Sequence, residues 1–247
     1  MKISAIVITF NEEENIKDCL ESVKWADEII VVDSKSSDET IEIARSYTDK
    51  VFSVEMQNVT EKRKFSVDKA ANDWILFVDA DERISKELGE EILELKPPND
   101  TAGYFLNRKN FYLGKWIKHC GIYPDYHIRL FNRKKAAVND RIIHEGIEVK
   151  GKTLQLIGAL LHYPVRNISG MVDKVNYYST MESQEHFNNG RKISKAGAFA
   201  HAIATFLVMY FSRKGFMDKL AGFYISLSYS VTTFMTYLKL LKLQNKI

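Results

Sequence analysis

Acidic residues gather at three points where an apolar run of the sequence ends. Glu12 follows ISAIVI, Asp33 closes EIIVVD, and Asp79 and Asp81 form a DxD pair at the end of WILFVD. Carboxylates that shared one edge of a fold would repel the phosphates of a substrate unless a cation lay between them. Carboxylate oxygens select Mg²⁺ or Mn²⁺. The pattern therefore predicts a divalent-metal site that binds a phosphorylated substrate.

The elements that position these acids are expected to be strands of one parallel sheet. Helical patterns separate runs that are apolar on both faces, and we expect strands at 3–8, 28–33, 51–54 and 74–79, with helices at 12–25, 38–48 and 61–71. This alternation predicts an α/β fold with a Rossmann-like, doubly wound half. Ligands bind at the carboxyl ends of such strands, so the acids are expected on one rim.

Each of these acidic elements has an ordinary explanation when it stands alone. An isolated DxD is most often a solvated turn, and an aspartate at a strand end is often a helix cap. The prediction of a site therefore depends on the joint occurrence of the three strand ends, in this order, on one rim.

The pattern changes after the break PPND at 97–100. We expect single strands at 102–107 and 127–132, a strand pair within 153–163, and a helix over 168–189. The predicted organisation is a catalytic domain over 1–165, with a nucleotide-binding half (1–96) and an acceptor half (97–165). A helical C-terminal region is expected over 166–247.

The C-terminal region is basic and carries two long apolar runs, 196–211 and 220–238. From Arg191 to the end there are nine Lys or Arg against one acid, Asp218, so this region has a net charge of +8. Because the whole chain has a net charge of +3, residues 1–190 have a net charge of −5. Basic flanks and ten aromatics between Phe199 and Tyr237 favour amphipathic helices on an anionic membrane surface. A helical hairpin packed on the catalytic domain and a pair of membrane spans are the alternatives. Nucleic acid is not expected as a partner.

The cysteines and the N-terminus bear on the compartment. Cys19 and Cys120 lack CxxC spacing, so neither a zinc site nor a disulfide framework is expected. The apolar run at the start is short and three acids follow it, unlike a signal peptide. We therefore expect a cytoplasmic protein that is peripheral on the inner face of the cell membrane.

The chain resembles a known family over roughly residues 2–240. The segments IVITFNEEENIKDCLESV, ADEIIVVDSKSSDET and DWILFVDADE are similar to glycosyltransferase family 2, the inverting enzymes of the GT-A fold. YPDYHIRLFNRKKAAVNDRIIHEGIEVKG and LLHYPVRNISGMVDKVNYYS resemble the WaaE/KdtX-like lipopolysaccharide core biosynthesis glycosyltransferases. The resemblance implies transfer of a hexose from a nucleotide-sugar donor, UDP-glucose, to a lipid-linked saccharide acceptor such as lipopolysaccharide core.

The resemblance also implies roles for individual residues. Residues at the three acidic strand ends and in one basic segment would bind the donor; they are Thr9, Phe10, Glu12, Asp33, Lys35, Arg63 and Asp79. Asp81 would bind the metal directly, and Asp79 would contact the metal or the ribose. Lys35 stands where the family commonly has glycine, and a lysine enters positive φ less freely. We therefore expect either a different loop there or an amine placed near phosphate.

The reaction also needs a base. In an inverting single displacement, a carboxylate takes the proton of the acceptor hydroxyl. Glu145, which stands beside His144 after the loop that follows the strand expected at 127–131, is the favoured base, and Asp125 in YPDY is the alternative. His144 or His162 would complete the metal shell.

Two other classes of function are compatible with parts of the sequence. A nucleotidyltransferase of related fold would place a glycine-rich basic loop after the first strand, where this chain has TFNEEEN. A non-catalytic membrane or nucleic-acid binding module would explain the basic tail, but it would not need the acidic rim. The sequence predicts no oligomeric state.

Overall fold

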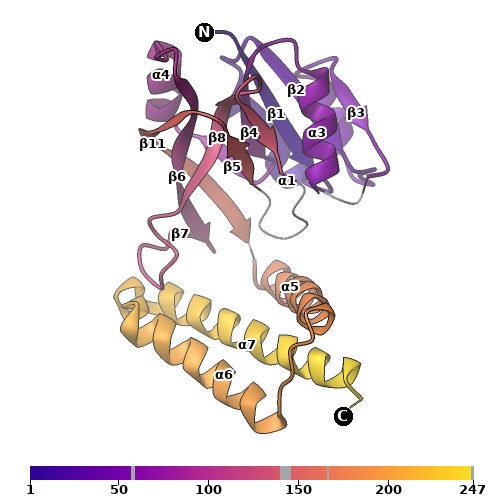
Figure 1. Cartoon of the computed structure of the whole chain (residues 1–247), viewed down its shortest axis with the longest axis vertical. Coiled ribbons are helices and arrows are strands. Elements are labelled where there is room, and N and C mark those ends of the chain that lie inside the picture. The colour runs from indigo at the N-terminus through magenta and orange to yellow at the C-terminus, as the bar shows by residue number, and fades with distance from the viewer. Residues whose placement is uncertain (57–58, 140–145, 166, 246–247) are drawn as a thin grey trace. The chain divides into compact units, whose positions relative to one another are not determined.

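The computed structural model describes residues 1–56, 59–139, 146–165 and 167–245 (Figure 1). Within them the chain divides into two compact units. Unit 1 comprises residues 1–108 and 125–162, and unit 2 comprises residues 109–124 and 163–247.

The first part of unit 1 alternates strands and helices. Its elements are β1 (Ile3–Thr9), α1 (Glu13–Ser22), β2 (Glu28–Asp33), α2 (Thr40–Arg45), β3 (Val51–Ser53), α3 (Val59–Lys69) and β4 (Trp74–Asp79). The strands lie parallel in the order β3-β2-β1-β4. The predicted α/β class is confirmed, and so is the placement of the carboxyl ends of these strands on one rim.

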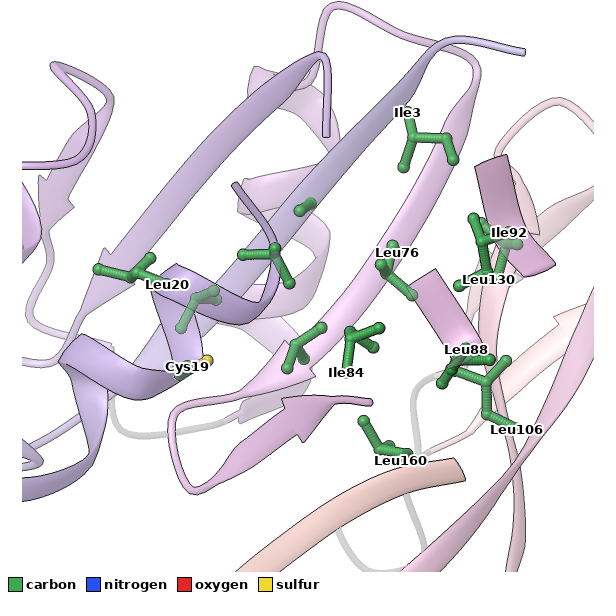
Figure 2. Close-up of a cluster of buried hydrophobic side chains, with 14 of the residues drawn as sticks. Ile3, Cys19, Leu20, Leu76, Ile84, Leu88, Ile92, Leu106, Leu130 and Leu160 are labelled. Atoms are coloured by element: carbon green, nitrogen blue, oxygen red, sulfur yellow. The ribbon is translucent and has the colours of Figure 1, made fainter. Parts of the chain in front are cut away.

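Both faces of the parallel strands are covered because their side chains are apolar on both sides. On one face Ala5 and Val7 of β1 pack with Ile16 and Leu20 of α1 in a buried cluster that Figure 2 shows in part. On the other face Ile6 packs in a second cluster, to which α3 contributes. Alternate residues of one strand thus fill two different cores, as period-2 geometry requires.

The second part of unit 1 extends the sheet with antiparallel strands. Its elements are β5 (Glu82–Ile84), α4 (Lys86–Glu94), β6 (Thr101–Tyr112), β8 (Tyr126–Asn132), β9 (Ala136–Val138), β10 (Ile147–Val149) and β11 (Lys152–Val165). The last residues of β6 and β11 belong to unit 2, as does a short β7 (Lys115–Trp116) that pairs with β6. The described sheet runs β3-β2-β1-β4-β8-β6-β11-β5, and β9 and β10 form a separate pair.

The strand pair expected within 153–163 is wrong, because β11 is one continuous strand of 14 residues. Gly158 lies in its middle, and it serves close packing rather than a turn. A Cβ built there would lie 2.4 Å from Leu88 Cα of α4, so only glycine lets this helix approach the strand. Helix α4 was not expected; the Ser85 hydroxyl caps it by accepting a hydrogen bond from the Leu88 amide.

Unit 2 is largely helical. It contains α5 (Ile168–Asn188), α6 (Lys195–Leu207), a π turn (Val208–Ser212), a 3₁₀ turn (Gly215–Asp218) and α7 (Lys219–Leu243). Asn167 and Ser194 cap α5 and α6, since their side chains accept hydrogen bonds from Gly170 and Gly197. The C-terminal helices expected from the sequence are therefore present. Among the residues described, no helix combines the length and the apolar character needed to cross a membrane.

Candidate active site

The ends of β1, β2 and β4 meet at one rim of the sheet. Thr9 pairs with Asp33, and Ile8 pairs with Asp79. Asp33 is fully buried, and its carboxylate accepts hydrogen bonds from the backbone and hydroxyl of Ser36. The Thr9 hydroxyl is also buried, and within the described residues it has no hydrogen-bond partner. The rim therefore holds a fixed carboxylate beside an unused hydroxyl.

The loop after β2 keeps a turn that glycine would favour. Lys35 has φ of +64°, so this lysine occupies the left-handed region despite its side chain. Lys35 thus adopts the backbone conformation that glycine enters more freely, and its side chain is exposed.

The segment after β1 begins helix α1. Phe10 is 55% exposed at the rim. The Glu12 carboxylate accepts a hydrogen bond from the Asn15 side-chain amide, and the Glu12 backbone amide donates to the Thr40 hydroxyl at the start of α2. Glu12 therefore ties the starts of the two helices together beside the rim.

Asp79 lies between two arginines from other elements. Arg63 of α3 places Nη2 3.1 Å from Oδ1, and Arg129 of β8 places Nη2 2.7 Å from Oδ2. Burial opposes the charged form of Asp79, but the Arg129 and Arg63 guanidiniums outweigh it and hold the pKa of Asp79 well below its usual range. Asp79 is therefore ionised throughout the neutral range.

Glu82 is a second, more deeply buried acid that contacts the same arginine, Arg129. Its side chain is fully buried and accepts hydrogen bonds from the Asp79 amide (3.0 Å), Arg129 Nη2 (2.7 Å) and Arg108 Nη1 (3.4 Å). Burial opposes the charged form of Arg129, but Asp79 and Glu82 together raise its pKa. Arg129 Nε is buried and, among the residues described, donates to no partner. One donor of this guanidinium is thus buried without a partner among the described residues.

Arg108 connects Glu82 to one of the two predicted bases. Its Nε donates to Asp125 Oδ2 at 2.8 Å, and His127 Nε2 lies 2.7 Å from Asp125 Oδ1. Burial opposes the charged form of Arg108, while Glu82 and Asp125 raise its pKa. Both oxygens of Asp125 are therefore already engaged by neighbouring side chains.

Asp81, the second acid of the DxD pair, faces a histidine of another strand. His162 of β11 pairs with Glu82 of β5, which brings His162 Nε2 to 3.3 Å from Asp81 Oδ2. Two donors to one octahedral cation at about 2.1 Å lie about 3 Å apart, so this separation fits a shared divalent ion. The Asp81 carboxylate is a ligand of the kind that suits Mg²⁺ or Mn²⁺. No third His, Cys, Asp or Glu of the described ranges completes such a group.

His144 and Glu145, the predicted metal ligand and favoured base, lie outside the described residues. The other predicted site residues are all in unit 1, on the strand ends and helices given above. The sequence did not predict roles for Glu82 and Arg108, nor the burial of Arg129 between two carboxylates. A detectable sign existed for Arg129, because a charged residue inside the apolar run HIRLF implies a buried carboxylate partner.

Comparisons with known proteins agree on the family. The model of glycosyl transferase family 2 matches residues 4–146. An uncharacterized glycosyltransferase of Rickettsia typhi is 30% identical over 99% of this chain and 88% of its own length. The lipopolysaccharide core biosynthesis glycosyltransferase LpsC of Rhizobium meliloti is 27% identical over 97% of this chain and 92% of its own.

A solved structure is similar over the whole chain. The crystal structure of Staphylococcus aureus TarS, residues 1–349, covers 100% of this chain and 92% of its own, at 17% identity and a TM-score of 0.42. In this chain a parallel half-sheet, covered by helices on both faces, carries an acidic rim and continues into antiparallel strands, which is the predicted GT-A arrangement. With the family match over more than half of its length, the chain belongs to glycosyltransferase family 2 and is a glycosyltransferase.

Proposed function

We propose that the chain transfers a hexose, glucose, from a UDP-sugar to a lipid-linked saccharide with inversion at the anomeric carbon. The observation that carries this proposal is that the two acids of the DxD pair have different partners. Asp79 is taken up by two guanidiniums, whereas Asp81 faces His162. In this proposal Asp79 holds the cations that would meet phosphate, and Asp81 would bind a metal together with His162.

The donor site is proposed along the strand ends. Asp33 would accept a hydrogen bond from the base, and Thr9, Phe10 and Glu12 would line the pocket beside it. Lys35, exposed on the loop after β2, is the donor-binding residue with the most freedom to reach a phosphate.

The diphosphate is proposed to lie near Arg63 and Arg129. Arg63 stacks over the Phe77 ring at 5.4 Å while it pairs with Asp79, so its guanidinium is fixed in two directions. The Arg129 guanidinium is likewise fixed, by Asp79 and Glu82. Fixed donors aimed at developing negative charge stabilise a leaving group without reorganisation.

Asp81 and His162 are proposed to hold Mg²⁺ or Mn²⁺, with Asp79 or His144 completing the shell. The bound ion would supply electrostatic stabilisation of the charge on the departing diphosphate. Asp79, whose lowered pKa keeps it ionised, would keep Arg63 and Arg129 beside that charge.

The base is proposed to be Glu145. In the transfer, the acceptor oxygen forms a bond to C1, the bond from C1 to the diphosphate oxygen breaks, its electron pair leaves with UDP, and the hydroxyl proton passes to the carboxylate. Asp125 is the alternative, but both its oxygens already accept hydrogen bonds from Arg108 and His127. Those contacts favour a positioning role for Asp125.

The acceptor is proposed to be a lipid-linked saccharide of the lipopolysaccharide-core class. The similarity to LpsC, whose name gives that role for the Rhizobium meliloti protein, supports this choice over the whole chain. The family match favours glycosyl transfer over the nucleotidyltransferase and binding-module alternatives.

Calorimetric titration of UDP with and without Mn²⁺ tests the donor and metal site. Wild type is expected to bind UDP much more tightly with Mn²⁺, and Asp81→Ala and His162→Ala should lose the metal-dependent part. Asp49→Asn is the matched control, because Asp49 is exposed in the loop that precedes β3, away from the carboxyl ends. Binding that is equal with and without metal would refute the metal assignment.

Anomer-resolved product analysis with Glu145→Gln and Asp125→Asn tests the chemistry. A lost general base costs on the order of 10²–10⁴-fold in rate. Glu145→Gln should show this loss with UDP affinity unchanged, and the product should have the inverted configuration. A retained configuration, or a full rate in Glu145→Gln, would refute the proposed mechanism.

A further inference from the structure

A ladder of aromatic rings crosses between two helices of unit 2. Phe199 of α6 contacts Phe234 of α7 at 4.7 Å between ring centroids, and Phe206 contacts Phe223 at 5.7 Å. Tyr210 contacts Phe206, Phe223 and Phe216 and so links the ladder to the turn between the helices. Ring contacts that alternate between two helices require a shared face. We call it the ladder face: Phe199, Phe206, Tyr210, Phe216, Phe223 and Phe234.

The ladder face is partly exposed, since Phe206, Tyr210 and Phe234 are half-buried while its other rings are exposed. Phe199 is 58% exposed near the start of α6, and Phe216 is 49% exposed at the turn. Ile203 and Leu220 share the same faces by helical spacing, and they are 60% and 64% exposed. Leu227 and Val231 continue the stripe along α7. A contiguous apolar surface of this extent marks an interaction site.

Positive charge brackets the ladder face at both ends. No Lys, Arg, Asp or Glu occurs over 196–212 or 220–238. Arg213, Lys214 and Lys219 are exposed at the turn. At the other end of the hairpin the exposed bases are Arg191, Lys192, Lys195 and Lys242.

The single acid of this region is turned inward. Asp218 is 8% exposed, and its carboxylate accepts hydrogen bonds from the Lys118 and His119 amides and lies 2.9 Å from His119 Nδ1. It therefore does not offset the bases at the surface. The described surface of the hairpin offers cations and apolar rings without exposed carboxylates.

We propose that the ladder face lies in the headgroup region of an anionic bilayer, with the axes of α6 and α7 parallel to the membrane plane. Exposed apolar residues along both helices, and basic residues at both ends of the hairpin, match this orientation. Insertion of the hairpin through its turn would need basic residues at one end only. Figure 1 shows α6 and α7 running alongside each other, as a flat contact requires. The proposal goes beyond the transfer reaction and does not depend on the donor or acceptor.

A second copy of the chain is a poorer occupant of this surface. In a twofold pairing, the basic turn of one copy would face either the basic turn or the basic far end of the other. Asp218 is not exposed to pair with those charges. Like charges across an interface oppose association, whereas anionic headgroups complement them.

Flotation of the full chain with vesicles tests the charge requirement. The vesicles are phosphatidylcholine alone, or phosphatidylcholine with about 30 mol % phosphatidylglycerol. Each Lys near an anionic surface contributes about fivefold to partitioning, so Lys214→Gln with Lys219→Gln should lower partitioning to anionic vesicles about 25-fold. Leu220→Ser should also weaken it, while Val172→Ser, equally exposed on α5, should not. Equal binding of all variants, or no binding to anionic vesicles, would overturn the proposal.

An environment-sensitive fluorophore on single introduced cysteines tests the orientation. Both native cysteines are fully buried, so Ile203→Cys, Leu220→Cys, Val231→Cys and the control Val172→Cys can be labelled selectively. A flat contact predicts similar blue shifts at 203, 220 and 231 on anionic vesicles, and none at 172. A shift at 220 alone would refute the in-plane orientation. Shifts without lipid, together with a doubled mass in sedimentation, would instead identify a second copy as the occupant.

Discussion

Arg129 is the residue whose replacement tests most sharply whether charge holds the site together. Its side chain is 7% exposed, and Nη2 lies 2.7 Å from both Asp79 Oδ2 and Glu82 Oε1. With charge centres about 4 Å apart and an effective dielectric constant of about 20, one such pair amounts to about 4 kcal/mol. Breaking a buried pair typically costs about 3–5 kcal/mol. Glu82 keeps the Asp79 amide and Arg108, so Arg129→Met should cost about 3 kcal/mol.

Urea unfolding followed by tryptophan fluorescence measures this cost. Trp25 and Trp74 lie in unit 1 and Trp116 in unit 2, so a Trp116→Phe background restricts the fluorescence to the unit that holds the site. With a slope of about 2 kcal/mol per molar urea, the Arg129→Met midpoint should fall by about 1–2 M.

The double variant decides whether the loss comes from the pair. Glu82→Gln removes the fully buried partner of Arg129, and the two substitutions together leave neither charge without its partner. The double variant should therefore be less destabilised than the sum of the singles, by about 1–3 kcal/mol. A midpoint for Arg129→Met within error of wild type, or strictly additive effects, would refute the reasoning.

Three further predictions concern single residues. The pKa of Asp79 is lower in the folded state than in the unfolded state, so ionised Asp79 stabilises the fold. This contribution is complete above the unfolded-state pKa of about 3.9 and decreases as the pH falls below it. Asp79→Asn should therefore flatten the pH dependence of the unfolding midpoint between about pH 5 and pH 2. Burial raises the pKa of both Cys19 and Cys120, so thiol reagents should modify neither until urea unfolds the protein, and modification of native protein would contradict the packing. Gly158→Ala should cost about 1–3 kcal/mol because a Cβ would lie 2.4 Å from Leu88 Cα. Gly170→Ala should be neutral or stabilising, because its Cβ would make only an ordinary contact with Asn167 Oδ1 at 3.5 Å; equilibrium unfolding of both variants would reveal the difference.

The parallel strands were predictable because their sequence is unambiguous. The expected strands at 28–33 and 74–79 coincide with β2 and β4, and β1 extends the expected 3–8 by one residue. Continuous apolar runs with helices between them leave few alternatives to a buried parallel sheet. Their shared rim then follows from topology alone.

The antiparallel part was harder to predict, since its determinants are contacts between distant segments. A glycine in the middle of LQLIGALLHY indicates a turn locally, yet Gly158 is there because α4 packs against β11. The pairing of β5 with β11, which brings His162 beside Asp81, joins segments about 80 residues apart. No local periodicity encodes such a pairing.

The charge network of the site shows the same limit. The acids at the strand ends could be read from sequence, but which cation meets which acid depends on strand register. Arg129 reaches Asp79 because β8 pairs with β4, with Leu130 opposite Leu76. Arg108 reaches Asp125 through the neighbouring pairing of β6 with β8.

Release of UDP from UDP-glucose by the purified full chain tests the central claim most directly. Wild type with Mn²⁺ and Asp81→Ala with Mn²⁺ are compared, with metal-free wild type and Asp49→Asn as controls. The proposed function predicts Mn²⁺-dependent release in wild type and Asp49→Asn that Asp81→Ala loses. Equal UDP release by Asp81→Ala and wild type would contradict the assignment of a metal-dependent UDP-sugar transferase. The same assignment would be contradicted if wild type neither released nor bound UDP in the presence of Mn²⁺.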